Sequence, residues 1–272
     1  MQDINLNNIK IICQRQGQMI FSVDENHIIK ALTLDADEMQ HALFLQEIKN
    51  IKYLKNKLRL LHVDSVLKHS ITEIKIENFD VLKSLNVCAE QIIIMPKYKN
   101  INILRFNLSQ KIMLIKKIIF IIYELHQMDC IHVDIKLSHF MQFGESGFEL
   151  RLIDFALIEK LTLENLNQNN NSFSRHATPS YMAPELFHGH AKTVKSDIYA
   201  LGLLIYEILV GKKAFIADNY QDWAIQHCQM PIPIMPKSIF ENHQQRQYWQ
   251  NIIDMMLQKH ADKRLGDLVD II

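Results

Sequence analysis

The stretch HVDIKLSHFMQFGESGFELRLIDFA, residues 132–156, determines how the rest of the chain is interpreted. It follows an apolar segment, residues 112–128, that is long enough for one helix. Within the stretch, two strand-like runs flank the turn GESG, which predicts a β-hairpin. Asp134 precedes this hairpin and Asp154 ends it. The other motifs of the chain are placed relative to this order of helix, loop and hairpin.

The bulk composition is that of a globular protein without a dominant charge. The chain has 272 residues, with 30 Lys and Arg against 30 Asp and Glu, so we do not expect a nucleic-acid-binding protein. Four dispersed cysteines without a CxxC pair favour reduced thiols in the cytoplasm over a disulfide framework or a zinc site. No signal-peptide or membrane-spanning pattern is visible, while export to another cell stays open.

The two parts of the chain differ in their hydrophobic pattern. The first ninety-odd residues contain short strand-like runs around one helix, and the remainder is mainly helical. Residues 197–209, DIYALGLLIYEIL, are apolar nearly all round and therefore predict a buried central helix. The Asn- and Ser-rich residues 165–176 predict a loop. We expect an α+β fold with a β-rich part followed by a larger helical part.

Further motifs follow Asp154 in a fixed order: TPSYMAPE at residues 178–185, SDIY at 196–199, and Lys263-Arg264. Together with HVDIK and DFA, these motifs resemble the eukaryotic-type protein kinase family in order and spacing. The resemblance extends from about residue 10 to the C-terminus.

This resemblance implies a bilobal kinase-like fold, with residues 1–97 as the N-lobe and residues 98–272 as the C-lobe of a single catalytic domain. It implies a Ser/Thr protein kinase that transfers the γ-phosphate of ATP to Ser or Thr hydroxyls of a protein substrate. The implied cofactors are ATP and Mg²⁺ or Mn²⁺. We expect a bare catalytic domain whose regulator or antagonist is a partner protein.

Phosphoryl transfer requires positioning and charge neutralisation more than covalent chemistry. By the resemblance, Asp134 orients the acceptor hydroxyl and accepts its proton, Lys136 reaches the γ-phosphate, and Asp154 holds the metal. Lys30, in the strand-like run HIIK, resembles the family lysine that contacts the α- and β-phosphates. Glu47 lies seventeen residues further on, in the N-terminal helix, where an ion pair would hold Lys30.

The phosphate-binding loop departs from the family. The pattern GxGxxGxV falls on Ile12, Gln14, Gly17 and Met19, and only Gly17 matches. Side chains at Ile12 and Gln14 could obstruct the close approach of backbone to phosphate that glycine permits. The alternatives are weak nucleotide affinity, a differently shaped loop, or lost activity.

Three other family positions are changed. His139 stands where the family has the Asn that binds a second metal, and it could contact metal or phosphate or pack structurally. Lipopolysaccharide sugar kinases resemble this chain in having His there. Ala156 replaces the glycine of DFG. Val133 replaces the Arg of HRD, so we expect activity that does not depend on a phosphorylated activation segment.

The segment between Asp154 and Glu185 resembles a kinase activation segment, with Ser172, Ser174 and Thr178 as candidate autophosphorylation sites. Thr178 resembles the family threonine that hydrogen-bonds the catalytic Asp and Lys, which favours Ser/Thr acceptors.

Two structural features complete the resemblance. The pair Glu185 and Arg264 resembles the buried ion pair of the C-lobe, and Asp197 resembles the residue that anchors the catalytic loop.

The adenine pocket follows only from position in the resemblance. Ile28 and Met19 are expected to form its roof, Met141 its floor, and Met95 to begin the hinge MPKY at residues 95–98. Plain core packing is the alternative for each of these side chains.

Two other functions compete with an active protein kinase. A pseudokinase or binding scaffold is favoured by the altered glycine loop, Ala156 and His139. A kinase-fold enzyme acting on a small molecule, lipid or sugar is favoured by His139 alone. The segment TPSYMAPE argues against the latter, because family enzymes with small-molecule substrates usually lack it.

Overall fold

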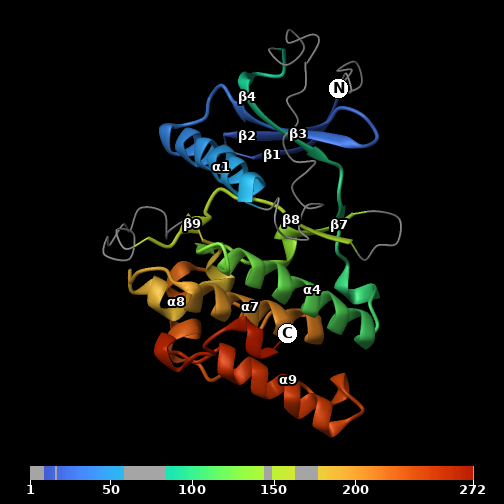
Figure 1. Ribbon diagram of the computed structural model, residues 1–272, viewed down its shortest axis with the longest axis vertical. Helices are drawn as coiled ribbons and strands as arrows, with labels where there is room; N and C mark the ends of the chain where they lie inside the picture. The colour runs from blue at the N-terminus through green and yellow to red at the C-terminus, as the bar shows by residue number, and fades with distance from the viewer. Residues whose placement is uncertain (1–8, 16, 58–83, 144–148, 163–176, 272) are drawn as a thin grey trace. The chain divides into compact units, whose positions relative to one another are not determined.

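The structure is a computed structural model, and the residues it describes are 9–15, 17–57, 84–143, 149–162 and 177–271 (Figure 1). The chain divides into two compact units. Unit 1 contains residues 1–99 and 154–156, and unit 2 contains residues 100–153 and 157–272.

Unit 1 is a four-stranded antiparallel sheet with one helix (Figure 1). Its strands follow each other in the sheet in chain order. The elements are β1 (Lys10–Arg15), β2 (Gln18–Ser22), β3 (His27–Thr33), α1 (Glu38–Lys57) and β4 (Val87–Pro96). One face of the sheet carries a buried apolar cluster that includes Phe21, Ile29, Ala31 and Ile94. Because side chains alternate between the two faces of a strand, residues between these project from the other face.

Helix α1 begins at a capping box. Asp37 Oδ1 accepts a hydrogen bond from the Gln40 N–H, and Gln40 Oε1 accepts one from the Asp37 N–H. The helix then buries side chains at helical spacing. These are Phe44, Glu47, Ile51 and Leu54. Asn50 is buried on the same helix. The charged glutamate requires a buried partner, because an unpaired buried charge is strongly unfavourable.

Unit 2 is mainly helical. Its longer helices are α4 (Leu108–His126), α7 (Val194–Val210), α8 (Tyr220–Gln229) and α9 (His243–Met256), with the short α6 (Pro184–Phe187). Its strands are β6 (Cys130–Ile131), β7 (Phe140–Phe143), β8 (Glu149–Leu152) and β9 (Glu159–Lys160), and β5 (Lys99–Asn100) spans the boundary of the units. Its 3₁₀ turns are η3 (Ile103–Arg105), η4 (Leu137–His139), η6 (Pro179–Tyr181), η7 (Lys237–Ile239), η8 (Ala261–Lys263) and η9 (Leu268–Ile271).

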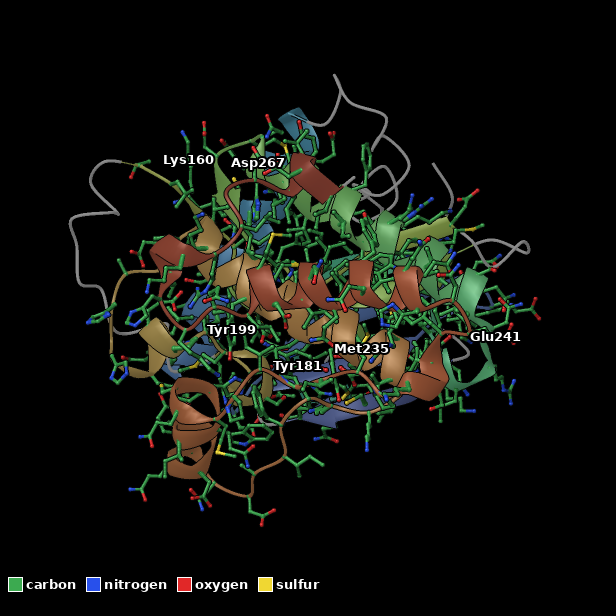
Figure 2. The ribbon with its side chains drawn as sticks, turned by 90° about the horizontal axis from the view of Figure 1, so that it is seen from below. Lys160, Tyr181, Tyr199, Met235, Glu241 and Asp267 are labelled. Carbon is green, nitrogen blue, oxygen red and sulfur yellow. The ribbon has the colours of Figure 1, made fainter. Side chains whose placement is uncertain are left out.

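Helix α7 is the centre of unit 2 and packs against both α4 and α9 (Figure 1). It begins at a capping box of Thr193 and Ser196 and ends at Gly211, which adopts the left-handed conformation with φ of 83°. Gly202 permits the close packing of α9, since a Cβ at this position would lie 2.8 Å from Met256 Cβ. Figure 2 shows the side chains of this unit, among them the buried Tyr181 and Tyr199.

The predicted hairpin is present as the antiparallel pair β7–β8, in which Phe140 faces Leu152. Its turn glycines, Gly144 and Gly147, lie outside the described residues. The predicted α+β fold, with a β-rich part followed by a helical part, is confirmed. Among the described helices, none combines the length and apolar character that a membrane crossing needs.

Candidate active site

Unit 1 contains a buried ion pair between its sheet and its helix. Lys30 Nζ on β3 lies 2.6 Å from Glu47 Oε2 on α1, and both side chains are almost fully buried. Burial would lower the pKa of Lys30, but the carboxylates of Glu47 and Asp154 outweigh this and raise it above its ordinary value. The ammonium therefore stays charged on the face of the sheet that α1 covers.

The DFA segment belongs to unit 1 and is attached to α1. Asn50, one turn beyond Glu47, donates a 2.7 Å hydrogen bond from Nδ2 to the carbonyl oxygen of Phe155. Asp154 has a positive φ of 66°, a conformation that aspartate tolerates better than most residues. The sequence analysis missed Asn50, because only the position of the Phe155 carbonyl in the fold distinguishes Asn50 from an ordinary helical asparagine.

The strand register decides which apolar side chains share a face with Lys30. Ile28 and Lys30 alternate along β3, and Met95 lies directly opposite Ile28 in the β3–β4 pairing. Ile28 and Met95 therefore lie on the same face as the ammonium.

Met19 is a correction to the expected adenine roof. It pairs with Ala31 and is buried in the apolar cluster on the opposite face, so it cannot share a pocket with Ile28. Its neighbour Ile20, which pairs with Lys30, lies on the face of Lys30 and Ile28. The alternation of side chains along β2 would have identified Ile20 if the strand register had been known.

Gly17 lies between β1 and β2 with a positive φ of 75°, which glycine adopts without strain. Its carbonyl accepts a 3.1 Å hydrogen bond from the Thr33 N–H. A Cβ at this position would lie 2.0 Å from Oε1 of Gln40, the residue that closes the capping box of α1. The glycine is therefore needed for a turn packed against α1.

Unit 2 holds Asp134 by contacts to both of its carboxylate oxygens. Lys136 Nζ donates to Oδ2 at 2.7 Å, and the Thr178 N–H donates to Oδ1 at 2.8 Å. Lys136 Nζ also donates to Thr178 Oγ1 at 2.8 Å. Burial would raise the pKa of Asp134, but Lys136 and His139 hold it below its ordinary value. Asp134 is consequently ionised at neutral pH.

The loop that carries Asp134 is fixed by Asp197 of α7. The two carboxylate oxygens of Asp197 accept hydrogen bonds from the N–H groups of His132 and Val133, at 2.7 and 2.8 Å. His126 Nε2 lies 3.0 Å from the same carboxylate. Val133 has a φ of 71°, which is unfavourable for a β-branched residue. The two charge-assisted hydrogen bonds offset this strain.

His139 lies at the end of η4, close to Asp134. Its Nε2 is 3.7 Å from Asp134 Oδ2, and its ring centroid is 5.7 Å from that of His132. The carbonyl oxygen of His139 accepts a hydrogen bond from the Ile153 N–H, which connects η4 to the residue preceding Asp154. The imidazole is thus held beside the carboxylate of Asp134.

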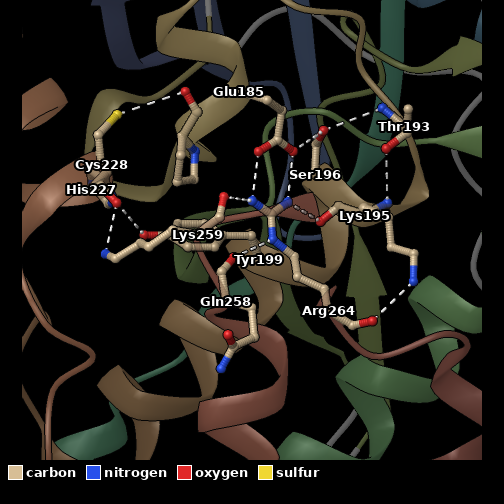
Figure 3. Close-up of polar contacts among 11 residues, drawn as sticks. Glu185, Thr193, Lys195, Ser196, Tyr199, His227, Cys228, Gln258, Lys259 and Arg264 are labelled. Atoms are coloured by element: carbon tan, nitrogen blue, oxygen red, sulfur yellow. Dashed lines mark hydrogen bonds and ion pairs between the residues drawn. The ribbon is translucent and has the colours of Figure 1, made fainter. Parts of the chain in front are cut away.

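Glu185 and Arg264 come together as expected for a buried brace (Figure 3). Arg264 donates to both oxygens of Glu185, at 2.7 and 2.6 Å, and its side chain is fully buried. Further bonds run from Arg264 to the carbonyl oxygens of Lys195, Gln258 and Lys259. This arrangement satisfies the guanidinium in full, as a buried charge requires.

The same region contains a buried histidine that sequence reasoning did not single out. His227 is fully buried and is surrounded by the rings of Phe187, Tyr199, Phe215 and Trp223. Burial, together with the charge of Lys259, lowers the pKa of His227 to about 3. Its imidazole is therefore neutral in the folded protein at any physiological pH.

The remaining predicted site residues are only partly placed. Met141 lies on β7 opposite Arg151 and is half-buried. Its role as the pocket floor stays a prediction. Ser172 and Ser174 lie outside the described residues.

The buried lysine–glutamate pair on a sheet, and the aspartate held by a lysine and a threonine in a helical unit, define the protein kinase class of fold. Comparison with known sequences agrees, since residues 29–270 match the family described as the protein kinase domain. The chain belongs to this family.

Several curated relatives are protein kinases by name. The chain is 32% identical over 148 residues to protein kinase C-like 1B of Caenorhabditis elegans, covering 53% of this chain and 19% of that protein. It is 29% identical over 146 residues to the probable serine/threonine-protein kinase PknB of Lactococcus lactis, and the match covers 54% of this chain and 22% of that protein. It is 31% identical over 143 residues to the serine/threonine-protein kinase PknA of Corynebacterium glutamicum, and the match covers 53% of this chain and 28% of that protein. The chain thus spans less than a third of the length of these relatives.

The family implies a divalent metal beside ATP. Mg²⁺ is usually bound by one or two carboxylates together with substrate phosphates, rather than by a complete protein cage. Among the described residues, no group of three or more His, Cys, Asp or Glu side chains is arranged to hold a metal. Asp154 supplies a suitable carboxylate, whereas the imidazole of His139 is a poorer ligand for Mg²⁺.

Proposed function

We propose that this chain is an active protein kinase that transfers the γ-phosphate of ATP to Ser or Thr hydroxyls of a protein substrate. The parts expected at residues 1–97 and 98–272 act together as one catalytic domain. The observation that carries the proposal is the contact of Lys136 with both Asp134 and Thr178. This arrangement places a base, a cation and a hydroxyl-bearing residue within one hydrogen-bonded group.

Asp134 acts on the acceptor hydroxyl. The ionised carboxylate accepts a hydrogen bond from the hydroxyl and orients its oxygen toward the γ-phosphorus. In the transfer step, a bond forms between this oxygen and the γ-phosphorus, and the bond from the γ-phosphorus to the bridging oxygen of ADP breaks. The hydroxyl proton passes to Asp134. Lys136 offsets the negative charge of the transferred group.

Lys30 binds the α- and β-phosphates, and Glu47 holds its ammonium in position. Asp154 holds the Mg²⁺ or Mn²⁺ ion, which offsets the charge of the phosphates when it is bound. Ile28 and Met95 supply apolar contacts to the adenine from the face of the sheet that carries Lys30. His139 contacts either the metal or a phosphate.

We further propose that the protein works in the cytoplasm and that a partner protein regulates it. The four cysteines are free, which is consistent with a reducing compartment. Nothing in the charge balance favours nucleic acid as a ligand.

The test is incubation of the purified protein with γ-labelled ATP and either Mg²⁺ or Mn²⁺, alone and with a generic protein substrate. We expect label on Ser or Thr residues, and its loss in Asp134→Ala and Asp154→Ala. Asp262→Ala, which removes an exposed carboxylate, serves as the matched control and should keep the activity. A folded protein that transfers no label with either metal would contradict the proposal. Label found only on an added sugar or lipid would favour the small-molecule alternative.

One observation favours a binding scaffold as the second candidate. Gly17 is the sole glycine of the expected phosphate loop, and its turn packs against Gln40. If the folded wild-type protein binds ATP but fails to transfer its phosphate, the scaffold is the better description.

A further inference from the structure

The phosphate loop of this chain lacks most of the backbone freedom on which a glycine-rich loop depends. Such a loop binds phosphates through closely approaching backbone N–H groups, and glycine is needed because a Cβ would obstruct them. Here Gly17 is the only glycine before β2, and it is used for the turn. The negative charge of a triphosphate must then be balanced by other groups.

The strand register places an arginine on the face of the sheet that carries Lys30. Arg15, the last residue of β1, pairs with Gln18 at the start of β2. Gln18 and Ile20 alternate to one face of β2, and Ile20 pairs with Lys30 on β3. Because directly paired residues project to the same face, Arg15 and Lys30 project to one side of the sheet.

A bulge produces this orientation. Ile11 pairs with Phe21 but Cys13 pairs with Ile20, so Ile12 is an extra residue in β1. If Ile12 instead continued the regular ladder opposite Ile20, every residue after it would project to the opposite face. Arg15 would then lie on the side of the buried apolar cluster.

Arg15 is available for an external anion. Its side chain is exposed, and within the described ranges no carboxylate forms an ion pair with it. The positive charge of Arg15 repels the ammonium of Lys30 and acts to lower the pKa of Lys30. An anion bound beside the two cations would reduce the repulsion between them. A guanidinium suits phosphate oxygens because it can donate two parallel hydrogen bonds.

We propose that Arg15 is a phosphate-binding residue that takes over the charge balance which the glycine loop provides elsewhere. Its ligand is the triphosphate of the nucleotide, bound beside Lys30, and the inference therefore rests on the proposed function. Arg15 contributes to nucleotide affinity, while the transfer step remains the work of Asp134. In this chain the guanidinium of Arg15 donates to the phosphates in place of the backbone N–H groups of a glycine loop. A single substitution can remove this donor.

The experiment measures the dissociation constants of ATP and of adenosine, by calorimetry with Mg²⁺ present, for the wild type and for Arg15→Ala, Arg15→Lys and Lys10→Ala. Lys10 is the matched control, because it is an exposed cation on the same strand at the end distant from Gly17. We expect Arg15→Ala to weaken ATP about 10- to 100-fold, the range for charged hydrogen bonds to phosphate. Adenosine affinity should be unchanged, and Arg15→Lys should restore part of the loss.

The outcomes separate this inference from the proposed function. If the wild type binds and uses ATP while Arg15→Ala binds it equally well, the inference fails and the proposed kinase activity stands. An equal loss in Lys10→Ala would also overturn it, because the effect would then reflect overall charge. If the folded wild type binds neither ATP nor adenosine, both proposals fail.

Discussion

The residues proposed for the nucleotide in unit 1 and those proposed for the acceptor in unit 2 are held in place by different means. In unit 2, both oxygens of Asp134 are hydrogen-bonded, and the main chain beside it is fixed by Asp197. In unit 1, Lys30 depends on the single side chain of Glu47 and on the register of the strands. Position is therefore specified by side chains in unit 2 and by β-sheet geometry in unit 1.

The largest expected effect removes the carboxylate of unit 2. Asp134→Asn should lower the turnover number about 10²- to 10⁴-fold, because the amide cannot accept the hydroxyl proton. The dissociation constant of ATP should remain close to that of the wild type, since Asp134 is proposed to act on the acceptor hydroxyl rather than on the nucleotide. Single-turnover phosphate transfer and calorimetry measure the two quantities. Equal losses of both would show that the two sets of residues are not functionally separate.

The second prediction concerns the brace of unit 2. Glu185→Ala leaves the buried guanidinium of Arg264 without its carboxylate and should lower the free energy of unfolding by about 3–5 kcal/mol. The measurement is urea unfolding. Asp262→Ala, which removes an exposed carboxylate, is the control and should cost about 1 kcal/mol or less. Similar losses in the two variants would contradict the assigned role.

The third prediction is the effect of acid on unit 2. Because the pKa of His227 is about 3 when folded and near 6.5 when unfolded, only the unfolded chain gains its proton between these values. The free energy of unfolding should therefore fall as the pH drops from 6.5 toward 3, by about 3 kcal/mol at pH 4 from this residue. In His227→Gln this part of the pH dependence should disappear.

The control for this prediction is His260→Gln, which alters an exposed histidine and should leave the pH dependence intact. Chemical unfolding at pH 7 and pH 4 gives the comparison. Identical slopes for the wild type and His227→Gln would show that other groups cause the acid sensitivity.

The smallest expected effect relieves strain beside Asp134. Val133→Gly and Val133→Ala both remove the buried isopropyl group, but only glycine adopts the positive φ without strain, so Val133→Gly should be the more stable of the two by about 1 kcal/mol. At Val194, the first residue of α7, the order should be reversed, because alanine favours a helix over glycine by about 1 kcal/mol. The measurement is thermal unfolding of the four variants, and a Val133→Gly variant less stable than Val133→Ala would argue against strain at Val133.

Sequence reasoning succeeded where chemistry is carried by side chains in ordered motifs. The motifs around Asp134, Thr178 and Glu185 predicted the α+β fold, and the structure brings Asp134 close to Thr178 and Glu185 close to Arg264. These contacts could be anticipated because the motifs match the protein kinase family in order and spacing, and the resemblance implies both pairs.

The rest depended on geometry that the sequence does not state. Met19 was assigned to the wrong face because the family pattern was aligned from Gly17, whereas the strand pairing decides which side chain faces Lys30. Asn50 and His227 have common residue types at ordinary helical positions. Only the tertiary fold places Asn50 beside the Phe155 carbonyl and His227 among aromatic rings.

The buried ion pair of unit 2 has a consequence for biosynthesis. Glu185 and Arg264 are separated by 79 residues, so the carboxylate is made well before its partner. At typical rates of translation this interval lasts roughly 4–16 s. During that time the carboxylate of Glu185 has no Arg264 to neutralise it, and the helical unit cannot reach its final packing before Arg264 has been added. A chaperone would therefore be needed most while residues 186–264 are being synthesised.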